Sequence, residues 1–501
     1  MTVQTASSAP VVRLYGGWRR QRGIGMWGLD AVSTAVVLLC FLGPLLLAAA
    51  SVRLGLMSAG PALLVAGLTT ARVGGVPLGV VAQRRARWTW GTLRGHRSGR
   101  FGANAPDGGR AMPAPLDRVR VVPVGSGRGE PFALVHDPGA GTLTVALRCA
   151  ASSTWLVDGA DADGWVSAWH SWLAALGYLP AVRWVGVVVD TAPEAGTSLR
   201  EGVLQRLDAG APADVRALLR ELVDRSPGAA AEVRTWVTVS FDEGLLGGAA
   251  RRQVDEQQRG AEADRLMTGL ESALGSCGVT VLGRAGVRDL VRAVRTAYDP
   301  VARGDLDRHR PDRGQPDLQW EEAAPVAVED DWDSFRHDSG TSVSWGWQEA
   351  PRQQVTSQVL SRLLSPGRHA KRVALLYRPL PAADAARTLE SEVNAAAFRD
   401  AYRRAQRRDE TARDVTDREQ ARRAAHEEAM GAGVVLLSVY VTTTVTDPAL
   451  LPEAVADVEA RADQSKIRLR KLYGGQAAGF ATTLPLGVHP ARLARSRRNS
   501  R

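Results

Sequence analysis

Two long uncharged runs near the N-terminus constrain this chain most. Residues 31–50 carry no charge, and after Arg53 a second uncharged run extends from residue 54 to residue 71. A third run, residues 73–82, follows Arg72. The apolar core of a bilayer is about 30 Å thick, and a helix needs about 20 apolar residues to cross it. The runs therefore predict a transmembrane hairpin, with helices at about 31–51 and 54–82.

Arginine and tryptophan flank this hairpin at both outer ends, whereas the turn between the helices carries only Arg53. Because positive charge marks the cytoplasmic side, both termini are predicted to be cytoplasmic in a multi-pass protein of the inner (plasma) membrane. A signal peptide would show one short apolar region, and two buried helices of a soluble core would leave the flanking arginines without a role. The residues expected at the membrane interface are Trp18, Arg19, Arg20, Trp27, Arg84, Arg85, Arg87, Trp88 and Trp90.

Composition limits what the remainder can be. The chain has 501 residues and a net charge of +10, and 45% of its residues are hydrophobic. This length predicts two or three folded domains beyond the hairpin. The membrane flanks account for the size of the net charge, so we do not interpret it as nucleic-acid binding. Cys40, Cys149 and Cys277 are isolated, which predicts neither a disulfide framework nor cysteine ligands for a metal.

Shifts in composition divide the chain into segments. These are a basic cytoplasmic N-terminus (1–30), the transmembrane hairpin (31–83), a basic juxtamembrane segment and linker (84–129), a first cytoplasmic domain (130–299), a linker (300–317), a second cytoplasmic domain (318–487) and a basic tail (488–501). Strand and helix patterns alternate in both domains. The predicted fold class is membrane-anchored α+β, with two α/β-sandwich domains of split β-α-β type and a long helical insertion.

Hydrophobic periodicity gives the expected elements. Strands are predicted at 119–124, 132–135, 143–147, 181–189, 233–241, 279–282, 343–347, 372–377, 434–445 and 467–473. Helices are predicted at 158–176, 198–207, 213–223, 255–274, 287–298, 354–364, 450–463 and 476–483, and one long helix or helical hairpin at 382–430.

Motifs for chemistry are weak. A P-loop needs glycines followed by Lys and Ser or Thr, but no lysine here follows a glycine, and the glycine-rich run 125–129 leads into a strand. His337, Asp338 and Ser339 are the residue types of a hydrolytic triad, yet a triad requires separate elements that converge on one atom. We interpret them as a capped turn. The histidines show no i, i+4 pair, so neither a metal site nor a cofactor is predicted.

Two clusters have a structural and a functional interpretation. Trp155, Trp165, Trp169, Trp172 and Trp184 lack interleaved basic residues, so core packing is favoured over nucleic-acid stacking. The long helix mixes acidic and basic residues, which favours a solvated face. The alternative is contact with a protein or DNA, and the residues predicted to dock a partner are Arg403, Arg404, Arg407, Arg408, Arg422 and Arg423.

Several blocks spread over nearly the whole chain resemble a known family. They are residues 15–20 (YGGWRR), 131–134 (PFAL), 298–300 (YDP), 336–340 (RHDSG), 349–352 (EAPR), 476–480 (QAAGF) and 484–487 (LPLG). The set resembles an actinobacterial integral membrane protein family associated with conjugation and type IV secretion. Residues 382–487 also look like the N-terminal, non-ATPase part of the conjugative VirB-family ATPases. In those proteins a motor follows, whereas fourteen residues follow here.

The resemblance implies a non-enzymatic inner-membrane scaffold that docks a separate motor ATPase in a DNA or protein translocation machine. Other secretion or conjugation subunits and an oligomeric assembly are the further partners it implies, beside the bilayer itself. No catalytic residue is carried over, because the motor is absent from the sequence. An E-like subunit of the type VII membrane core is the alternative within the same class. A membrane-bound hydrolase is the alternative of a different class.

Overall fold

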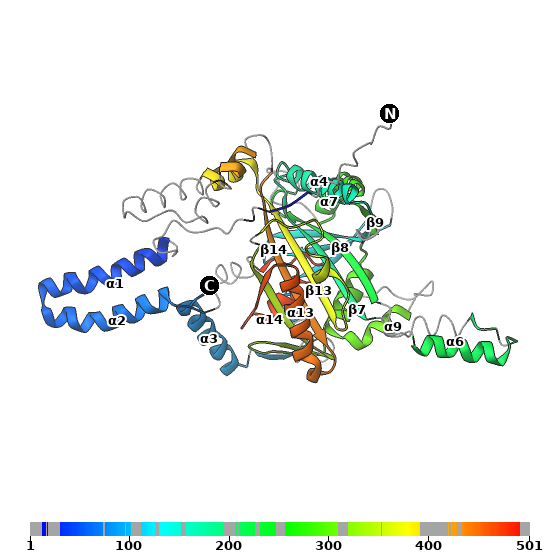
Figure 1. The fold of residues 1–501 in the computed structure, drawn as a ribbon, viewed down its shortest axis with the longest axis horizontal. Coiled ribbons are helices and arrows are strands. Elements are labelled where there is room, and N and C mark those ends of the chain that lie inside the picture. The colour runs from blue at the N-terminus through cyan, green and yellow to red at the C-terminus, as the bar shows by residue number, and fades with distance from the viewer. Residues whose placement is uncertain are drawn as a thin grey trace, which may run out of the picture. The chain divides into compact units, whose positions relative to one another are not determined.

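The computed structural model describes residues 13–16, 18, 31–73, 76–95, 97–101, 112–125, 130–151, 157–193, 206–208, 210–225, 231–246, 256–308, 319–351, 353–390, 419, 422–427 and 433–490. These residues form two compact units (Figure 1). The smaller unit takes its residues from 17–97 and 382–432, and the larger from 1–16, 98–381 and 433–501.

The smaller unit contains a helical hairpin. α1 (Ala31–Ala50) and α2 (Val52–Thr70) lie side by side and are joined at Ser51. A two-stranded turn of β1 (Arg72–Val73) and β2 (Val76–Pro77) follows, and then α3 (Leu78–Leu93). The second predicted helix, 54–82, is therefore too long, because the chain leaves helical geometry at Ala71 and starts a new helix after Pro77. Within the predicted helix 382–430, residues 382–390 and 422–427 are helical.

The larger unit is built on one 13-stranded antiparallel sheet. Its strands are β3 (Ser98–Arg100), β4 (Arg120–Val124), β5 (Phe132–Asp137), β6 (Thr142–Ala151), β7 (Val182–Pro193), β8 (Ala231–Asp242), β9 (Val279–Arg284), β10 (Ala327–Asp330), β11 (Phe335–His337), β12 (Gly340–Glu349), β13 (Ala370–Pro379), β14 (Val435–Val445) and β15 (Arg468–Lys471). The strand order is β3-β10-β11-β12-β14-β13-β7-β8-β6-β5-β4, with β15 against β12 and β9 against β6.

Helices connect these strands. The α-helices are α4 (Gly159–Leu176), α6 (Ala213–Arg225), α7 (Glu256–Leu274), α8 (Val287–Tyr298), α9 (Arg303–Arg308), α10 (Ser361–Leu364), α13 (Leu451–Gln464) and α14 (Gln476–Thr482). Short 3-10 helices are η5 (Gly275–Cys277), η6 (Pro300–Ala302), η7 (Trp320–Ala323) and η8 (Pro448–Leu450).

The two predicted cytoplasmic domains share this sheet. β7, from residues 130–299, pairs with β13, from residues 318–487, between Lys371↔Thr191 and Tyr377↔Val185. The expectation of two separate sandwiches therefore differs from the structure. The reason is physical: a strand buried on both faces has the same sequence pattern whether its neighbour lies in its own half or in the other half of the chain.

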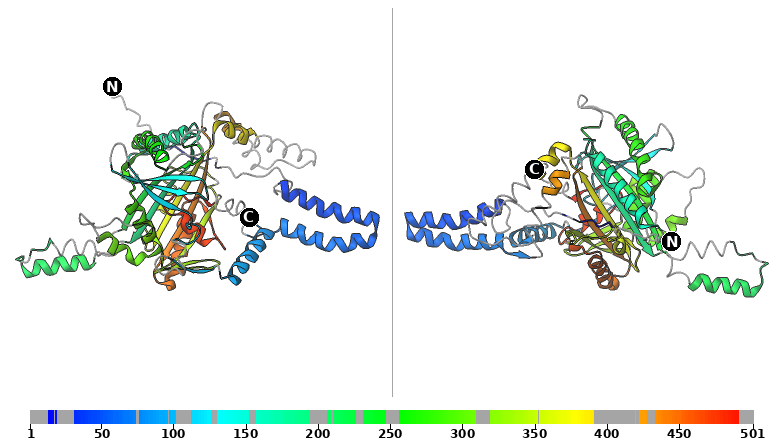
Figure 2. Two further views of the ribbon diagram at one scale, coloured as in Figure 1. Left: turned by 180° about the vertical axis from the view of Figure 1, so that it is seen from behind. Right: turned by 45° about the horizontal axis from the view of Figure 1, so that its top comes forward.

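Both faces of the sheet are covered (Figure 2). On one face, α4 and α7 pack against the first half of the sheet, and α13 packs against the second half. On the other face, one continuous core includes residues of α8 and α14 together with Val188 and Ala374. Alternation along each strand explains this arrangement, because successive side chains point to opposite faces.

Most predicted elements of the larger unit are confirmed within a few residues, and the helix predicted at 287–298 has the observed bounds. One expectation is wrong, because the helix predicted at 354–364 is reduced to the single turn α10. The first residues of the predicted linker 300–317 form η6 and α9, and its remainder lies outside the described residues. The helix predicted at 198–207 lies mostly outside the described residues.

Candidate membrane-binding site

The hairpin α1–α2 has an apolar outer surface. Ser33–Ala50 and Val52–Thr70 have mean hydropathies of 2.2 and 1.4, and both helices are long and apolar enough to cross a membrane. Only 6% and 11% of these stretches is buried. Leu39, Leu56 and Met57 are more than 70% exposed. A soluble protein seldom exposes a continuous apolar patch of this kind.

Small residues hold the two helices together. A Cβ added at Gly55 would lie 2.4 Å from the Cβ of Ala48, so only glycine permits this close approach. Three hydroxyl groups of α2 bond within their own helix: Ser58 to the Gly55 carbonyl at 3.0 Å, Thr69 to the Ala66 carbonyl at 2.9 Å and Thr70 to the Ala66 carbonyl at 2.7 Å. These three groups are thus satisfied without water, which an apolar medium requires.

Helix α3 carries a basic and aromatic surface. Arg84, Arg85 and Arg87 are exposed, and α3 contains no acidic residue. The guanidinium of Arg85 lies 5.1 Å from the ring centroid of Trp88. Arg94 lies 4.8 Å from the ring centroid of Trp90, whose side chain is 60% exposed. Cation–π contacts place indole and guanidinium groups together, a combination suited to anionic headgroups.

The structure gives the position of most predicted interface residues. Trp18 is 37% exposed, and Trp88 and Trp90 lie on α3 together with the three arginines. Arg19, Arg20 and Trp27 lie outside the described residues. Among the predicted docking residues, Arg422 and Arg423 are exposed on the helical segment 422–427. The other four, Arg403, Arg404, Arg407 and Arg408, lie outside the described residues.

The neighbours His337, Asp338 and Ser339 do not contact one another as a triad would. The hydroxyl of Ser339 bonds to Asp299, and Asp338 accepts bonds from the backbone amides of Val326 and Ala327. Asp338 has a φ of 25°, which fits the tight turn between β11 and β12. The interpretation of these residues as a capped turn agrees with these contacts.

His337 instead belongs to a buried hydroxyl network. Its Nε2 lies 2.7 Å from Ser342 Oγ, and its Nδ1 lies 2.5 Å from the carbonyl oxygen of Tyr298. Ser342 Oγ is in turn 2.8 Å from Thr444 Oγ1. Burial lowers the pKa of His337 to about 4, so its ring is neutral at pH 7. A histidine only 2% exposed serves here to satisfy polar groups inside the sheet.

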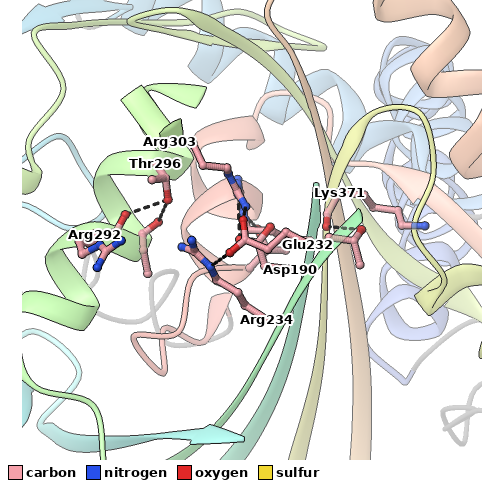
Figure 3. Close-up of polar contacts among 11 residues, drawn as sticks. Asp190, Glu232, Arg234, Arg292, Thr296, Arg303 and Lys371 are labelled. Carbon is pink, nitrogen blue, oxygen red and sulfur yellow. Dashed lines mark hydrogen bonds and ion pairs between the residues drawn. The ribbon is translucent and has the colours of Figure 1, made fainter. Parts of the chain in front are cut away.

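A charged cluster joins α9 to the sheet (Figure 3). The guanidinium of Arg303 lies 3.1 Å from Asp190 and 2.9 Å from Glu232. Burial favours the neutral form of Arg303, but the two carboxylates keep its pKa above the usual value. Glu232 also pairs with Arg234. Sequence reasoning missed this cluster because Arg303 lies in the segment interpreted as a linker.

Two neighbouring basic residues of β13 are also buried. Burial lowers the pKa of Lys371 to about 8, and its Nζ donates to the carbonyl of Ser365 at 3.0 Å. Burial lowers the pKa of Arg372 to about 10, although the charge of Asp190 opposes that shift. The Arg372 guanidinium carbon lies 4.7 Å from the ring centroid of Phe480. These contacts connect β13 with the elements packed on both faces of the sheet.

The described residues offer neither a metal-binding group of side chains nor a thiol with a lowered pKa. No group of three His, Cys, Asp or Glu residues in that part of the chain is arranged to hold a metal ion. Burial raises the pKa of Cys149 to about 11 and also raises the pKa of Cys277. Both thiols are therefore protonated at neutral pH and unreactive.

The hairpin with its basic and aromatic neighbour α3 is thus the most distinctive surface of the described chain. Comparison with protein-family models and with curated proteins finds no match.

Proposed function

We propose that this chain is an inner-membrane subunit whose α1–α2 hairpin crosses the bilayer, with both termini in the cytoplasm. The exposed apolar surface of α1 and α2 carries the proposal. Water would have to solvate these leucines in a soluble protein, whereas lipid removes that cost at about 25 cal/mol for each Å² buried. The arginines and indoles of α3 would then lie at the cytoplasmic interface.

The larger unit is proposed to be a non-enzymatic scaffold of a conjugation or secretion machine that docks a separate motor ATPase. The sequence resemblance supports this, as does a sheet whose polar residues are engaged in core contacts. His337 and Ser342, a pair that a hydrolase would expose, are 2% and 0% exposed. The hydrolase alternative therefore gains no specific support from their geometry.

Recovery of partners tests the scaffold. The full chain is purified from native membranes in mild detergent, and co-purifying proteins are identified by mass spectrometry. A motor ATPase of a conjugative system is the expected result. A type VII motor would assign the chain to that system instead, and recovery of no ATPase would contradict the docking role.

The docking surface is tested by charge reversal. Arg407, Arg408, Arg422 and Arg423 are changed together to Glu, and motor recovery is compared across a salt series. Recovery should fall at moderate salt, because rim charges govern association and its salt dependence. Reversal of Arg216 and Arg220 on α6 is the matched control. If both variants recover the motor as well as the unchanged chain does, residues 382–430 are a solvated face.

A further inference from the structure

The two halves of the sheet have the same topology. Six strands of the first half, β4–β9, correspond in order to β10–β15 of the second. In each half the first strand pairs with the second, the second with the third, the third with the fifth and the fifth with the fourth. The sixth strand of each half pairs with the far end of the third. All these pairings are antiparallel.

Helices and backbone geometry follow the same plan. α7 and α13 each connect the fifth and sixth strands, and α8 and α14 each follow the sixth strand. Between the helix and the sixth strand, each half places one residue in the left-handed region. That residue is Gly278 in the first half, with φ 71°, and Lys466 in the second, with φ 57°. Lysine seldom adopts this conformation, so a shared backbone requirement explains it better than local sequence does.

The halves meet through their fourth strands, β7 and β13. Val188 lies opposite Ala374, and the pairing continues equally on both sides of this pair. An antiparallel pairing of two equivalent strands has twofold symmetry. A local twofold axis therefore passes near Val188 and Ala374 and relates one half of the sheet to the other.

We propose that the chain is an internal repeat of one six-stranded module, closed within a single chain like a dimer, and that the edge of β7 is a docking surface selective for β13 of the unlike half. The β7–β13 pairing forms the seam between the two modules. The partner this surface fits is thus a second module of the same topology, and two pairs of unlike residues beside the axis make the fit selective.

Charge distinguishes the two halves at the seam. Asp190 lies opposite Arg372, and both residues are buried, with exposed fractions of 8% and 5%. If two first halves were paired about Val188, Asp190 would face Gly186 instead. If two second halves were paired about Ala374, Arg372 would face Leu376. Either like pairing would place each buried charge opposite an uncharged residue and lose the attraction between Asp190 and Arg372 across the seam.

Volume distinguishes them in the same way. Gly186 lies opposite Leu376, and a Cβ added at residue 186 would be 3.2 Å from the Leu376 side chain and 2.5 Å from Thr238 Oγ1. The leucine thus occupies space that the glycine leaves. Arg303 on α9, in the connection between the halves, binds Asp190 beside the seam and favours closure within one chain.

Cysteine cross-linking tests where the seam closes. A site-specific protease site is inserted within residues 309–318 of the full chain, and Val188→Cys is combined with Ala374→Cys. After oxidation the protein should migrate as a monomer, and after cleavage its two fragments should remain linked on a non-reducing denaturing gel. Val187→Cys with Ala374→Cys is the matched control, because residue 187 projects from the opposite face and should not link. Single-cysteine variants control for the three natural cysteines.

Three outcomes would overturn the proposal. One is the absence of a link between residues 188 and 374, and another is a link only between two copies of the chain. The third is separation of the unlinked, cleaved fragments under native conditions, because a docking surface of this extent should hold them at one to one.

Selectivity is tested on the cleaved chain through Asp190→Ala, Arg372→Leu and the double variant. Asp190→Ala should speed fragment dissociation on the order of 100-fold, because it leaves the buried Arg372 without an opposite charge across the seam. Arg372→Leu should have a smaller effect, because Asp190 keeps its ion pair with Arg303. The double variant should dissociate far more slowly than the product of the two single-variant rate increases would give. Asp214→Ala with Arg220→Leu on α6 is the control and should leave dissociation unchanged. Independent effects of the two changes would refute the selective role of this pair.

Discussion

Substitution of arginine in the middle of each hairpin helix tests whether the hairpin is inserted in the lipid bilayer. Leu39 and Leu63 are suitable, since they lie near the middle of α1 and α2 and are 73% and 66% exposed. On the insertion scale each Leu, Val or Phe contributes about −0.3 to −0.6 kcal/mol, and an arginine at the helix centre costs about 2.5–3.5 kcal/mol.

The composition of the helices sets the expected magnitude. α1 contains ten Leu, Val or Phe residues and α2 contains seven. By the same scale α2 gains only about 2–4 kcal/mol on insertion, so Leu63→Arg offsets most or all of that gain. The free energy of insertion of α1 is more favourable, so Leu39→Arg alone should reduce membrane insertion less than Leu63→Arg does. The combined variant should lose membrane insertion.

Alkaline carbonate extraction of membranes measures this loss. The unchanged chain should stay in the pellet, Leu63→Arg should be partly extracted, and the combined variant should be mostly extracted. Leu282→Arg is the matched control, because Leu282 is equally exposed, at 63%, but lies on β9 of the sheet. Retention of the combined variant at the level of the unchanged chain would refute insertion of the hairpin.

Three further predictions concern topology and stability. Reporters fused at residues 10 and 110 should both show cytoplasmic activity, and opposite results would mean a single span. Lys466→Gly should raise the free energy of unfolding of the larger unit by about 1 kcal/mol, because it relieves a left-handed backbone, whereas Gly278→Ala should lower it in the same denaturant titration. Burial lowers the pKa of His337 from an ordinary 6.5 to about 4. The free energy of unfolding of the larger unit should therefore be unaffected above pH 6.5 and should decrease as the pH falls from 6.5 to 4. His337→Gln should abolish that decrease.

Local patterns in the sequence predicted most individual elements, because burial on one face leaves a period of two in strands and 3.6 in helices. These patterns did not locate the end of α2, where the backbone leaves helical geometry inside an apolar run. The sequence already carries Arg72 and Pro77 inside the run taken as one helix of 54–82, and α2 ends at Thr70. The turn before α3 was therefore foreseeable from these interruptions.

The buried charges could not be foreseen in the same way. Arg303 stands in a segment rich in charge and glycine, and its carboxylate partners lie 113 and 71 residues away. Asp190 follows the apolar run 185–189, so the sequence pattern indicates only the end of the strand predicted at 181–189, although β7 continues to Pro193. Pairing over such distances depends on which strands become neighbours, and no periodicity in a single segment encodes that.

The joining of the two predicted domains follows from the same limit. Residues 185–189 and 373–376 are continuous apolar runs, which indicate strands covered on both faces but do not identify the neighbouring strands. What selects the neighbour is complementarity across the seam, where an acid meets a base and a glycine meets a leucine. Each of those residues is unremarkable in its own strand and informative only opposite its partner. Gly186→Ala should therefore destabilise the larger unit, because the added Cβ meets both Leu376 and Thr238 Oγ1. Leu376→Ala is destabilising by itself, because it leaves a cavity at a buried position. The double variant should lose less free energy of unfolding than the sum of the two single changes, because the missing leucine side chain makes room for the new methyl group, while the contact with Thr238 Oγ1 remains.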